Sequence, residues 1–407
     1  MIMQDNEKKP ALRFKGFTDP WEQRKLGEIA VFSKGVGYSK NDLCEEGTPI
    51  ILYGRLYTKY ETCIFDVDTF VKEKAGSVYS KGGEVIVPAS GETAEDISIA
   101  SVVVKPGILL GGDLNIVSPT AEYDSAFLAL TISSGATHKY LSSLAQGKSV
   151  VHLHNSDIQS VSAKFPTKRE QEKIHLIFGK IDTLITLHQR KYEKLVNIKK
   201  SMLDKMFPKN GASVPEIRFK GFTDPWEQRK LGDITVELSE YATQELGLPL
   251  LTSSRSGLMY QDEYRDSRTT KSTETLFSVV PVGTCTYRHM SDDDVFHMNI
   301  NTLEKGLVSR EYPVFEASKG NNLEFLVQHI NSSEEFKAFC AEQKKGGTRT
   351  RLYYNTLCQF TVRVPALKEQ AQISQCLKKL DTLITLHQRK LEKLQNIKKS
   401  CLEKMFV

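Results

Sequence analysis

The sequence predicts an α+β protein built as a pseudo-twofold repeat. It contains two tandem domains of mixed α and β structure and two long helices that pack as an antiparallel intramolecular coiled coil. Two observations lead to this fold class. Residues 13–27, RFKGFTDPWEQRKLG, return unchanged at residues 218–232. Residues 182–207 and 381–406 are identical at 22 of 26 positions. The chain is therefore two copies of one plan: a short lead-in, a globular region and a long helix.

The repeat divides the 407 residues into four segments. We expect residues 1–166 to form an N-terminal tail and the first domain, and residues 167–207 to form the first long helix. Residues 208–365 then contain a linker and the second domain, and residues 366–407 form the second long helix. A chain of this length is sufficient for two domains with cores of their own.

Both long segments show the heptad pattern of a coiled coil. One line of the seam consists of Ile174, Ile181, His188, Leu195 and Met202 in the first copy, and of Ile373, Leu380, His387, Leu394 and Cys401 in the second. We place the second line three residues later, at Ile177, Leu184, Lys191 and Ile198, and at Cys376, Leu383, Lys390 and Ile397. The apolar stripe is widened by Phe178, Ile185 and Tyr192, and by Leu377, Ile384 and Leu391. Helices of about 40 residues extend roughly 60 Å and need a partner for their apolar face. The two copies are the obvious partners.

His188 and His387 interrupt the apolar seam at equivalent positions, each followed by Gln-Arg-Lys. They are either a switch or ligand site, or polar breaks that fix the register of the two helices. We favour the register, which is a well-attested use of polar residues in such seams.

Composition points to a cytoplasmic protein without a membrane span or signal peptide. No apolar run approaches the 18 or so residues that a span needs, and the first residues are polar and charged. The seven cysteines are scattered and form no CxxC pair, which disfavours zinc sites and disulfides. The long helices hold ten basic against five acidic residues and nine against four, so the rest of the chain has a net charge of −5. Any nucleic-acid binding by the domains must therefore use local basic clusters.

Each globular region alternates β-rich runs with helical patterns, as a mixed α+β domain does. The β-rich runs are residues 48–53, 84–88 and 99–104 in the first domain, and residues 277–281, 283–287 and 360–364 in the second; the helical patterns lie near 124–134 and 323–343. The two regions barely match each other in sequence between their repeated ends. A constant scaffold with different contents suits a protein that presents two different binding surfaces.

No catalytic constellation is recognisable. The chain has no P-loop, no G-x-S-x-G, no H-E-x-x-H and no N-P-P-aromatic sequence of adenine methyltransferases. His152 and His154, with Asp157 close by, are conceivable metal ligands, but a strand edge or DNA-facing loop is the favoured interpretation. We therefore predict no catalytic residue and no metal site.

Basic clusters with glycines are the best candidates for a binding surface. Residues 344–351, KKGGTRTR, place four cations and two glycines together without an acid, and residues 146–155 form a Gly-Lys loop at the corresponding place of the first domain. Glycines let a backbone approach phosphate, and arginine can pair with guanine through two hydrogen bonds. The candidate DNA contacts are Lys344, Lys345, Thr348, Arg349 and Arg351; Lys148, His152, His154 and Asn155; and, from smaller clusters, Arg55, Arg268, Lys271 and Arg288. Plain solvated surface is the alternative for each cluster.

The duplicated motifs resemble those of one family over nearly the whole chain. They are the 15-residue lead-in, the Pro-x-x-x-Glu-Gln-x-x-Ile entry to each helix at 166–174 and 365–373, and the Asp-x-Leu-Ile run with its lysine-rich continuation. In this order they resemble the specificity (S) subunits of type I restriction–modification systems, which defend cells against foreign DNA.

The resemblance implies two target recognition domains, each reading one half of an asymmetric bipartite DNA sequence. The conserved helices would fix the gap between the halves and dock two adenine-N6 methyltransferase subunits, and motor–nuclease restriction subunits would join through these. The resemblance also implies that this subunit is not an enzyme and that S-adenosylmethionine, ATP and magnesium are bound by its partners. Two alternatives are a tandem adaptor that binds proteins through its domains, and a nuclease or methyltransferase in its own right. The missing motifs disfavour the second.

Overall fold

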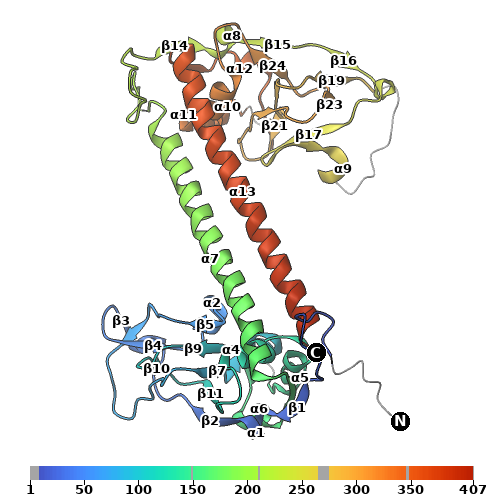
Figure 1. Cartoon of the computed structure of the whole chain (residues 1–407). Coiled ribbons are helices and arrows are strands. Elements are labelled where there is room, and N and C mark those ends of the chain that lie inside the picture. Colours follow the sequence, from blue (N-terminus) through green and yellow to red (C-terminus); the bar gives the residue numbers. More distant parts are fainter. Residues whose placement is uncertain (1–8, 148–149, 210, 265–274, 345–347, 407) are drawn as a thin grey trace. The chain divides into compact units, whose positions relative to one another are not determined.

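The computed structural model describes residues 9–147, 150–209, 211–264, 275–344 and 348–406. The chain forms two compact units (Figure 1): unit 1 comprises Met1–Arg190 together with Gln388–Val407, and unit 2 comprises Lys191–His387. Within the described ranges, no helix combines the length and the apolar character needed to cross a membrane.

The two long helices, α7 (Lys168–Lys205) and α13 (Leu367–Met405), each contribute one part to unit 1 and the other part to unit 2. In the sequence each helix forms a segment of its own, whereas in the structure each part of a helix packs with one of the domains. The mixed α/β domains and the paired long helices confirm the predicted fold class.

The described residues of unit 1 form a five-stranded sheet, a four-stranded sheet and two pairs of strands. The strand orders are β2-β11-β7-β9-β5, β10-β4-β6-β3, β1-β13 and β12-β8. The strands are β1 (Glu22–Lys25), β2 (Ala30–Lys34), β3 (Leu43–Cys44), β4 (Thr48–Ile51), β5 (Cys63–Ile64), β6 (Phe70–Val71), β7 (Glu84–Pro88), β8 (Ser90–Gly91), β9 (Ser101–Val103), β10 (Leu109–Leu110), β11 (Leu114–Pro119), β12 (Val151–His152) and β13 (Ser162–Phe165). The helices before α7 are α1 (Leu26–Ile29), α2 (Arg55–Thr58), α3 (Ala94–Ile97), α4 (Ser125–Ile132), α5 (Gly135–Leu144) and α6 (Asn155–Ser160).

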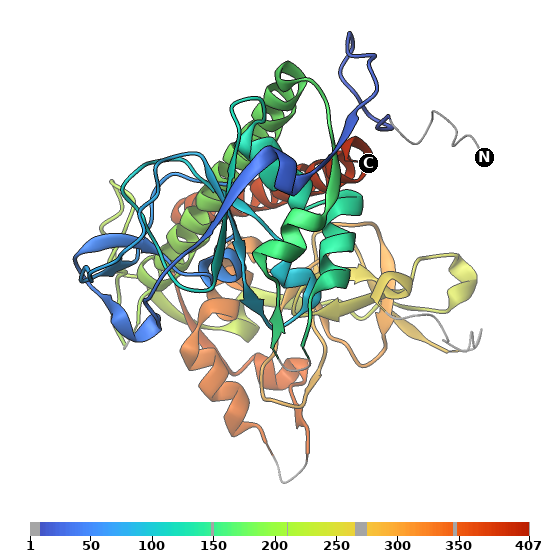
Figure 2. The ribbon, with the colours of Figure 1, turned by 90° about the horizontal axis from the view of Figure 1, so that it is seen from below.

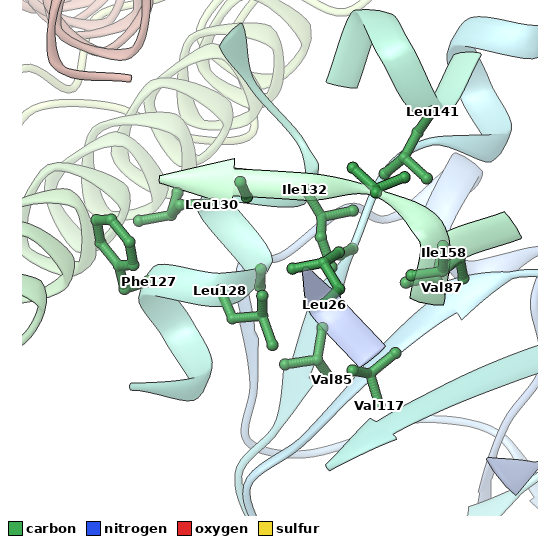
Figure 3. Close-up of a cluster of buried hydrophobic side chains, with 14 of the residues drawn as sticks. Leu26, Val85, Val87, Val117, Phe127, Leu128, Leu130, Ile132, Leu141 and Ile158 are labelled. Atoms are coloured by element: carbon green, nitrogen blue, oxygen red, sulfur yellow. The ribbon is translucent and has the colours of Figure 1, made fainter. Parts of the chain in front are cut away.

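Helix α4 is the centre of the unit 1 core, because its sequence SAFLALTI is apolar on almost every side. Asp124 caps it by accepting a hydrogen bond from the backbone N–H of Phe127 at 2.7 Å. Figure 3 shows its side chains meeting those of α1, the central strands and the later helices. The labelled residues of this core are Leu26, Val85, Val87, Val117, Phe127, Leu128, Leu130, Ile132, Leu141 and Ile158.

Unit 2 repeats this plan with different sheets. The strand orders are β15-β24-β20-β22, β16-β19-β23, β14-β26, β17-β18 and β21-β25. The strands are β14 (Glu227–Lys230), β15 (Thr235–Glu237), β16 (Tyr241–Ala242), β17 (Leu251–Ser254), β18 (Gly257–Tyr260), β19 (Phe277–Val280), β20 (Cys285–Thr286), β21 (Met290–Ser291), β22 (Asn299–Ile300), β23 (Gly306–Ser309), β24 (Val314–Ala317), β25 (Thr350–Arg351) and β26 (Thr361–Val364). The helices before α13 are α8 (Leu231–Ile234), α9 (Gln261–Tyr264), α10 (Leu323–Ser332), α11 (Glu334–Glu342) and α12 (Tyr354–Leu357). Every β-rich run and helical region named from the sequence contains such an element.

The repeated lead-in forms the same structure in both units. Strand β1 pairs antiparallel with the last domain strand, β13, and β14 pairs in the same way with β26. Trp21 is buried with its ring edge-on to Phe127, and Trp226 lies likewise against Phe325. The lead-in therefore closes each domain by packing on the helix that its core is built around.

A buried ion pair joins each lead-in to the start of the long helix. In unit 1, the guanidinium of Arg13 donates from Nε and Nη2 to the two carboxylate oxygens of Glu170, both at 2.7 Å. In unit 2, Arg218 binds Glu369 in the same way at 2.7 and 2.8 Å. The side chains of Glu170 and Glu369 are 0% and 1% exposed, so each carboxylate depends on its arginine.

The glutamine that follows this glutamate fixes the angle at which the helix leaves the domain. The side-chain amide of Gln171 donates to the carbonyl of Pro166 at 2.8 Å, and its oxygen accepts from the backbone N–H of Asp124 at 2.9 Å. Gln370 makes the equivalent bonds to Pro365 and Asn322. The Glu-Gln pair of the sequence motif thus ties the lead-in, the domain and the helix together.

The long helices pack antiparallel within each unit. In unit 1, Ile174 and Phe178 near the start of α7 share a core with Met405 and Phe406 at the end of α13. In unit 2, the relation is reversed: Met206 and Phe207 follow the end of α7 and pack with Ile373 and Leu377 near the start of α13. Reciprocal ion pairs accompany this packing.

Those ion pairs link equivalent residues of the repeat. Lys398 lies 2.6 Å from Asp182 in unit 1, and Lys199 lies 2.5 Å from Asp381 in unit 2. The residue before each lead-in also binds the end of a long helix through its backbone: the N–H of Ile217 donates to the carbonyl of Lys205 at 2.9 Å. The N–H of Leu12 donates to the carbonyl of Lys404 at 2.9 Å, so the blue N-terminal segment lies beside the C-terminal end of α13 (Figure 2).

The aromatic core of unit 2 encloses a histidine. The ring of His329 stacks on Phe207 with 4.7 Å between centroids and lies edge-on to Trp226. Burial lowers the pKa of His329 to about 4, so the ring is neutral at pH 7. Its role is that of an aromatic core residue.

The structure corrects one line of the predicted seam. Ile174 and Ile373 are buried, and Ile181, His188, Leu195, Leu380, His387 and Leu394 are half-buried along the helices. The other line lies four residues after the first, at Phe178, Ile185, Tyr192 and Lys199, and at Leu377, Ile384, Leu391 and Lys398. The apolar residues of this line are those that widen the stripe in the sequence. The line three residues later is mostly exposed: Ile177, Leu184, Leu383 and Ile397 are 36%, 45%, 42% and 40% exposed, and only Ile198 and Cys376 are half-buried. Both lines are apolar in the sequence, so periodicity alone could not choose between them.

We predict that Arg13→Ala destabilises unit 1 by about 2–4 kcal/mol, because it leaves the Glu170 carboxylate buried without its partner. Hydrogen exchange of the α4 backbone amides measures this as a drop in the free energy of opening. The matched control is Arg24→Ala, which removes an exposed pair with Glu22 and should cost at most about 1 kcal/mol. Equal effects of the two substitutions would contradict the role given to the buried pair.

Candidate nucleic-acid interface

The two glycine loops singled out in the sequence lead into equivalent structures. In unit 1, β12 pairs antiparallel with β8, and in unit 2, β25 pairs in the same way with β21. We call these pairs the short ladders. A leucine follows each pair directly. The backbone N–H of Leu153 donates to the carbonyl of Ala89 at 3.0 Å, and that of Leu352 donates to the carbonyl of His289 at 2.9 Å. The two ladders therefore occupy the same place in the two domains.

Their exposed side chains differ. The fixed backbone register sets His152 of unit 1 equivalent to Arg351 of unit 2, and His154 equivalent to Tyr353. All four side chains are exposed. In each ladder these two residues flank a fully buried leucine, so alternation along the strand turns both toward the same side. One common backbone thus presents two imidazoles in one domain, and a guanidinium and a phenol in the other.

Neighbouring groups hold the histidine ladder of unit 1 in place. Nδ1 of His152 lies 3.1 Å from the hydroxyl of Ser90 on the paired strand. The amide of Asn155 donates to the carbonyl of Ser33 at 2.9 Å, which ties the start of α6 to β2. Asn155 therefore has a structural bond, and its predicted DNA contact stays a prediction.

Two arginines of unit 2 remain open beside a buried histidine. Arg288 and Arg351 are exposed, and no ion pair engages either of them among the described residues. His289 between them is 4% exposed and stacks on Tyr353 with 5.8 Å between ring centroids. Burial lowers the pKa of His289, and the positive charges of Arg351 and Arg288 lower it further, against the opposing effect of Glu311. Sequence reasoning missed Tyr353, although its position two residues after Arg351 mirrors the His-x-His pattern.

The basic run 344–351 is less open than its sequence suggests. The Nε of Arg349 donates to Asp292 at 2.7 Å, and the ammonium of Lys344 lies 3.6 Å from Asp294. Thr348 is exposed. The run itself contains no acid, but carboxylates from the segment after β21 lie beside it. The three consecutive aspartates at 292–294 were the signal in the sequence for this arrangement.

Arg55 is engaged inside the first domain. Its side chain is 8% exposed and binds Glu61 at 2.9 Å and Asp68 at 2.6 Å. Lys59 also binds Asp68, and these two partners, Lys59 foremost, lower the pKa of Asp68 to about 2. The geometry gives Arg55 a structural role, and its DNA contact stays a prediction without support from its surroundings.

The remaining candidates, Lys148, Lys345, Arg268 and Lys271, lie outside the described residues. Within the part of the chain that the structure describes, no group of three His, Cys, Asp or Glu side chains is placed to hold a metal ion.

The two units thus share a duplicated frame and differ in the exposed side chains of their short ladders. Comparison with known proteins gives the family. The model of the type I restriction modification DNA specificity domain matches residues 18–197 and 297–396, which is more than half of the chain. The chain belongs to this family. As a specificity subunit it is a non-catalytic targeting subunit of a restriction–modification complex.

A solved structure shares the fold. The S subunit of the type I restriction-modification system from M. genitalium superposes with a TM-score of 0.63 at 13% sequence identity, over 98% of this chain and 99% of that chain. The HsdS subunit from Thermoanaerobacter tengcongensis aligns over 95% of this chain and 96% of its own, with 14% identity and a TM-score of 0.44.

Proposed function

We propose that the two domains read the two halves of an asymmetric, bipartite DNA sequence through their short ladders. The observation that carries this proposal is the pair of equivalent ladders with unlike exposed side chains, His152 and His154 in one domain and Arg351 and Tyr353 in the other. The major groove of B-DNA, about 12 Å wide, admits a two-stranded β-ribbon. Unlike side chains on a common backbone then select different bases.

The open cations of unit 2 suit this task. Arg288 and Arg351 can each bind a phosphate or pair with the O6 and N7 of guanine. Imidazoles, as in the ladder of unit 1, can donate or accept hydrogen bonds at base edges. Because the domains are not broadly basic, affinity depends on such local groups.

The test of modular reading is a domain replacement. Replacing residues 28–165 with the corresponding domain of a relative should change one half of the methylated sequence and leave the other half as it was. Sequencing of methylated adenines in DNA from cells that carry the chimera and its methyltransferase gives the result. A change in both halves, or in neither, contradicts the proposal.

Arg351→Ala should weaken duplex binding. Loss of a base contact costs about 1–3 kcal/mol and relaxes one base position, whereas loss of a phosphate contact weakens all sequences alike and reduces the salt slope by about 1. Titration of the full chain with duplex DNA at several salt concentrations distinguishes the two. The matched control is Arg229→Ala, which removes an exposed arginine of the shared lead-in.

A chain whose binding shows no salt dependence would be a protein adaptor instead, because phosphate contacts release counterions.

We further propose that the repeated helix segment docks two adenine-N6 methyltransferase subunits, through which motor–nuclease subunits join. In unit 1, Leu184 and Leu187 are 45% and 48% exposed on α7; in unit 2, the equivalent Leu383 and Leu386 are 42% and 44% exposed on α13. The decapeptide that contains each pair is identical in both copies. Exposed apolar side chains repeated in this way fit two copies of one partner. On this proposal S-adenosylmethionine, ATP and magnesium serve the partner subunits.

Substitution of one leucine in each copy tests the docking. Leu187→Glu should leave one bound methyltransferase per chain, Leu386→Glu likewise, and the double variant none, because a buried charge opposes an apolar contact. The mass of the purified complex measures the stoichiometry. Leu176→Glu is the control, since Leu176 is 55% exposed on α7 but has no leucine counterpart in the second copy. Loss of binding in this control, or two bound copies in the double variant, would refute the docking surface.

We also propose that the lengths of α7 and α13 set the gap between the half-sites, because both are unbroken from one unit into the other. Inserting one heptad after Lys180 and one after Lys379 preserves the seam and adds about 10 Å of helix. At roughly 34–36 Å per 10–10.5 base pairs, this corresponds to about three more base pairs. In a selection among duplexes with different gap lengths, the preferred gap should lengthen accordingly, while the bases read in each half stay the same. Weaker binding is expected as well, because the added base pairs rotate one half-site around the duplex. If the preferred gap length stays the same, the helices do not set the distance between the half-sites.

A further inference from the structure

Three consecutive aspartates, residues 292–294, stand against the cations of the short ladder in unit 2. They follow directly on β21, while Arg349 and Lys344 come from the chain before β25 and Arg255 from the turn between β17 and β18. The first aspartate accepts a hydrogen bond from Arg349 at 2.7 Å, the second pairs with Arg255, and the third lies 3.6 Å from Lys344. Three positive charges thus face three negative charges.

This balance of charges distinguishes Arg349, which pairs with Asp292, from Arg351, which has no ion pair among the described residues. A phosphate that approaches Arg349 also approaches the neighbouring carboxylates, which repel it. The edge of a base is neutral and carries no such penalty. The surroundings of Arg349 therefore favour a base over the DNA backbone.

The contact geometry leaves the reading end of Arg349 available. Its bond to Asp292 uses Nε, and within the described ranges no hydrogen bond engages the two terminal nitrogens. These nitrogens form the fork that matches the O6 and N7 of guanine. The bond at Nε restricts the rotation of the side chain, so less freedom is lost when the fork binds.

The short ladder of unit 1 shows a similar arrangement. There the hydroxyl of Ser90, on the first strand of the ladder, meets Nδ1 of His152 on the second strand at 3.1 Å. In both units a polar group from the first strand or its continuation therefore holds an exposed polar side chain at the second strand. The two contacts therefore correspond in what they do, although the residue types differ.

We propose that Asp292 is a positioning residue that orients Arg349, and that Arg349 reads a guanine in the second half-site. This inference rests on the proposed function, because it assumes that the short ladder of unit 2 faces DNA. On this proposal Arg349 contacts a base and does not contact a phosphate.

The experiment selects bound duplexes from a pool with randomised base pairs, using the full-length chain. The wild type should prefer guanine at one position by about 5- to 150-fold, the range for a bidentate pair. Arg349→Lys keeps the charge but loses the fork, so this preference should fall to about threefold or less, with the affinity for mixed-sequence DNA within about threefold of wild type. Asp292→Ala should lower the preference several-fold. It should also steepen the salt slope by about 0.9, because the freed guanidinium can now bind a phosphate.

Glu334→Ala is the matched control for charge. It removes an exposed carboxylate that binds Lys337 at 2.6 Å on α11 of the same domain, and it should leave the selected sequence unchanged. The side chains of Asp292 and Arg349 are 65% and 52% exposed, so their replacement leaves the core intact.

The outcomes separate this inference from the proposed function. If the wild type selects a sequence and Arg349→Lys selects the same bases, Arg349 is not the reader and the inference is overturned, while DNA reading stands. If Arg349→Lys loses the preference and Asp292→Ala keeps it with an unchanged salt slope, the positioning role of Asp292 is overturned. If the wild type selects nothing and binds without salt dependence, the proposed function fails and the inference fails with it.

Discussion

Each domain completes its core with the end of the helix that belongs to the other repeat, and the rest of the architecture depends on this exchange. Phe406 stacks on Phe127 in unit 1 with 5.4 Å between ring centroids, and Phe207 packs against Phe325 in unit 2 at 5.5 Å. An aromatic side chain at the centre of a core contributes much of its stability. Neither core can therefore form fully unless both helices are present and run in opposite directions. This constraint explains why the lead-ins and the helix ends are nearly identical in the two copies, and why the same Pro, Glu, Gln and Ile recur at each helix entry.

The same constraint leaves the interiors of the domains free to diverge. The frame consists of the buried Arg–Glu pairs, the glutamines at the helix entries and the tryptophans of the lead-ins, and it is the same in both units. The short ladders are attached to this frame at equivalent places, and each has a fully buried leucine between its two exposed side chains. Exposed positions on such a ladder can change without cost to the core. On the proposed function, a specificity subunit that reads unlike half-sites gains from this separation of scaffold and surface.

The sequence predicted the fold class and the repeat because these depend on strong, local signals. Identical segments and heptad spacing are read directly, and the two loops were placed correctly as counterparts from their position before the last strand. The second line of the seam was placed at Leu184, although the widened stripe also contained Ile185, because both residues are apolar and only the position of the partner helix decides between them. Leu184 and its repeat Leu383 turned out to be exposed, which is what makes them candidates for a docking surface.

The charged candidates were harder to judge for a physical reason. Arg55 and Arg349 look like free cations in the sequence, but their partners Asp68 and Asp292 come from other segments that only the fold brings near. Arg288 and Arg351, in contrast, have no ion pair among the described residues, and a count of charges in the sequence could not show this. Tyr353 was overlooked because its spacing from Arg351, which mirrors His152 and His154, gains meaning only when the two ladders are aligned in the structure.

The most direct measurement of the central claim is a map of methylated adenines in DNA from cells that carry this chain with its methyltransferase. The account predicts two unlike half-sites separated by a gap of constant length and unspecified sequence, since two unlike ladders are carried on one constant frame. A symmetric sequence, a single uninterrupted one, or half-sites at variable separations would contradict it.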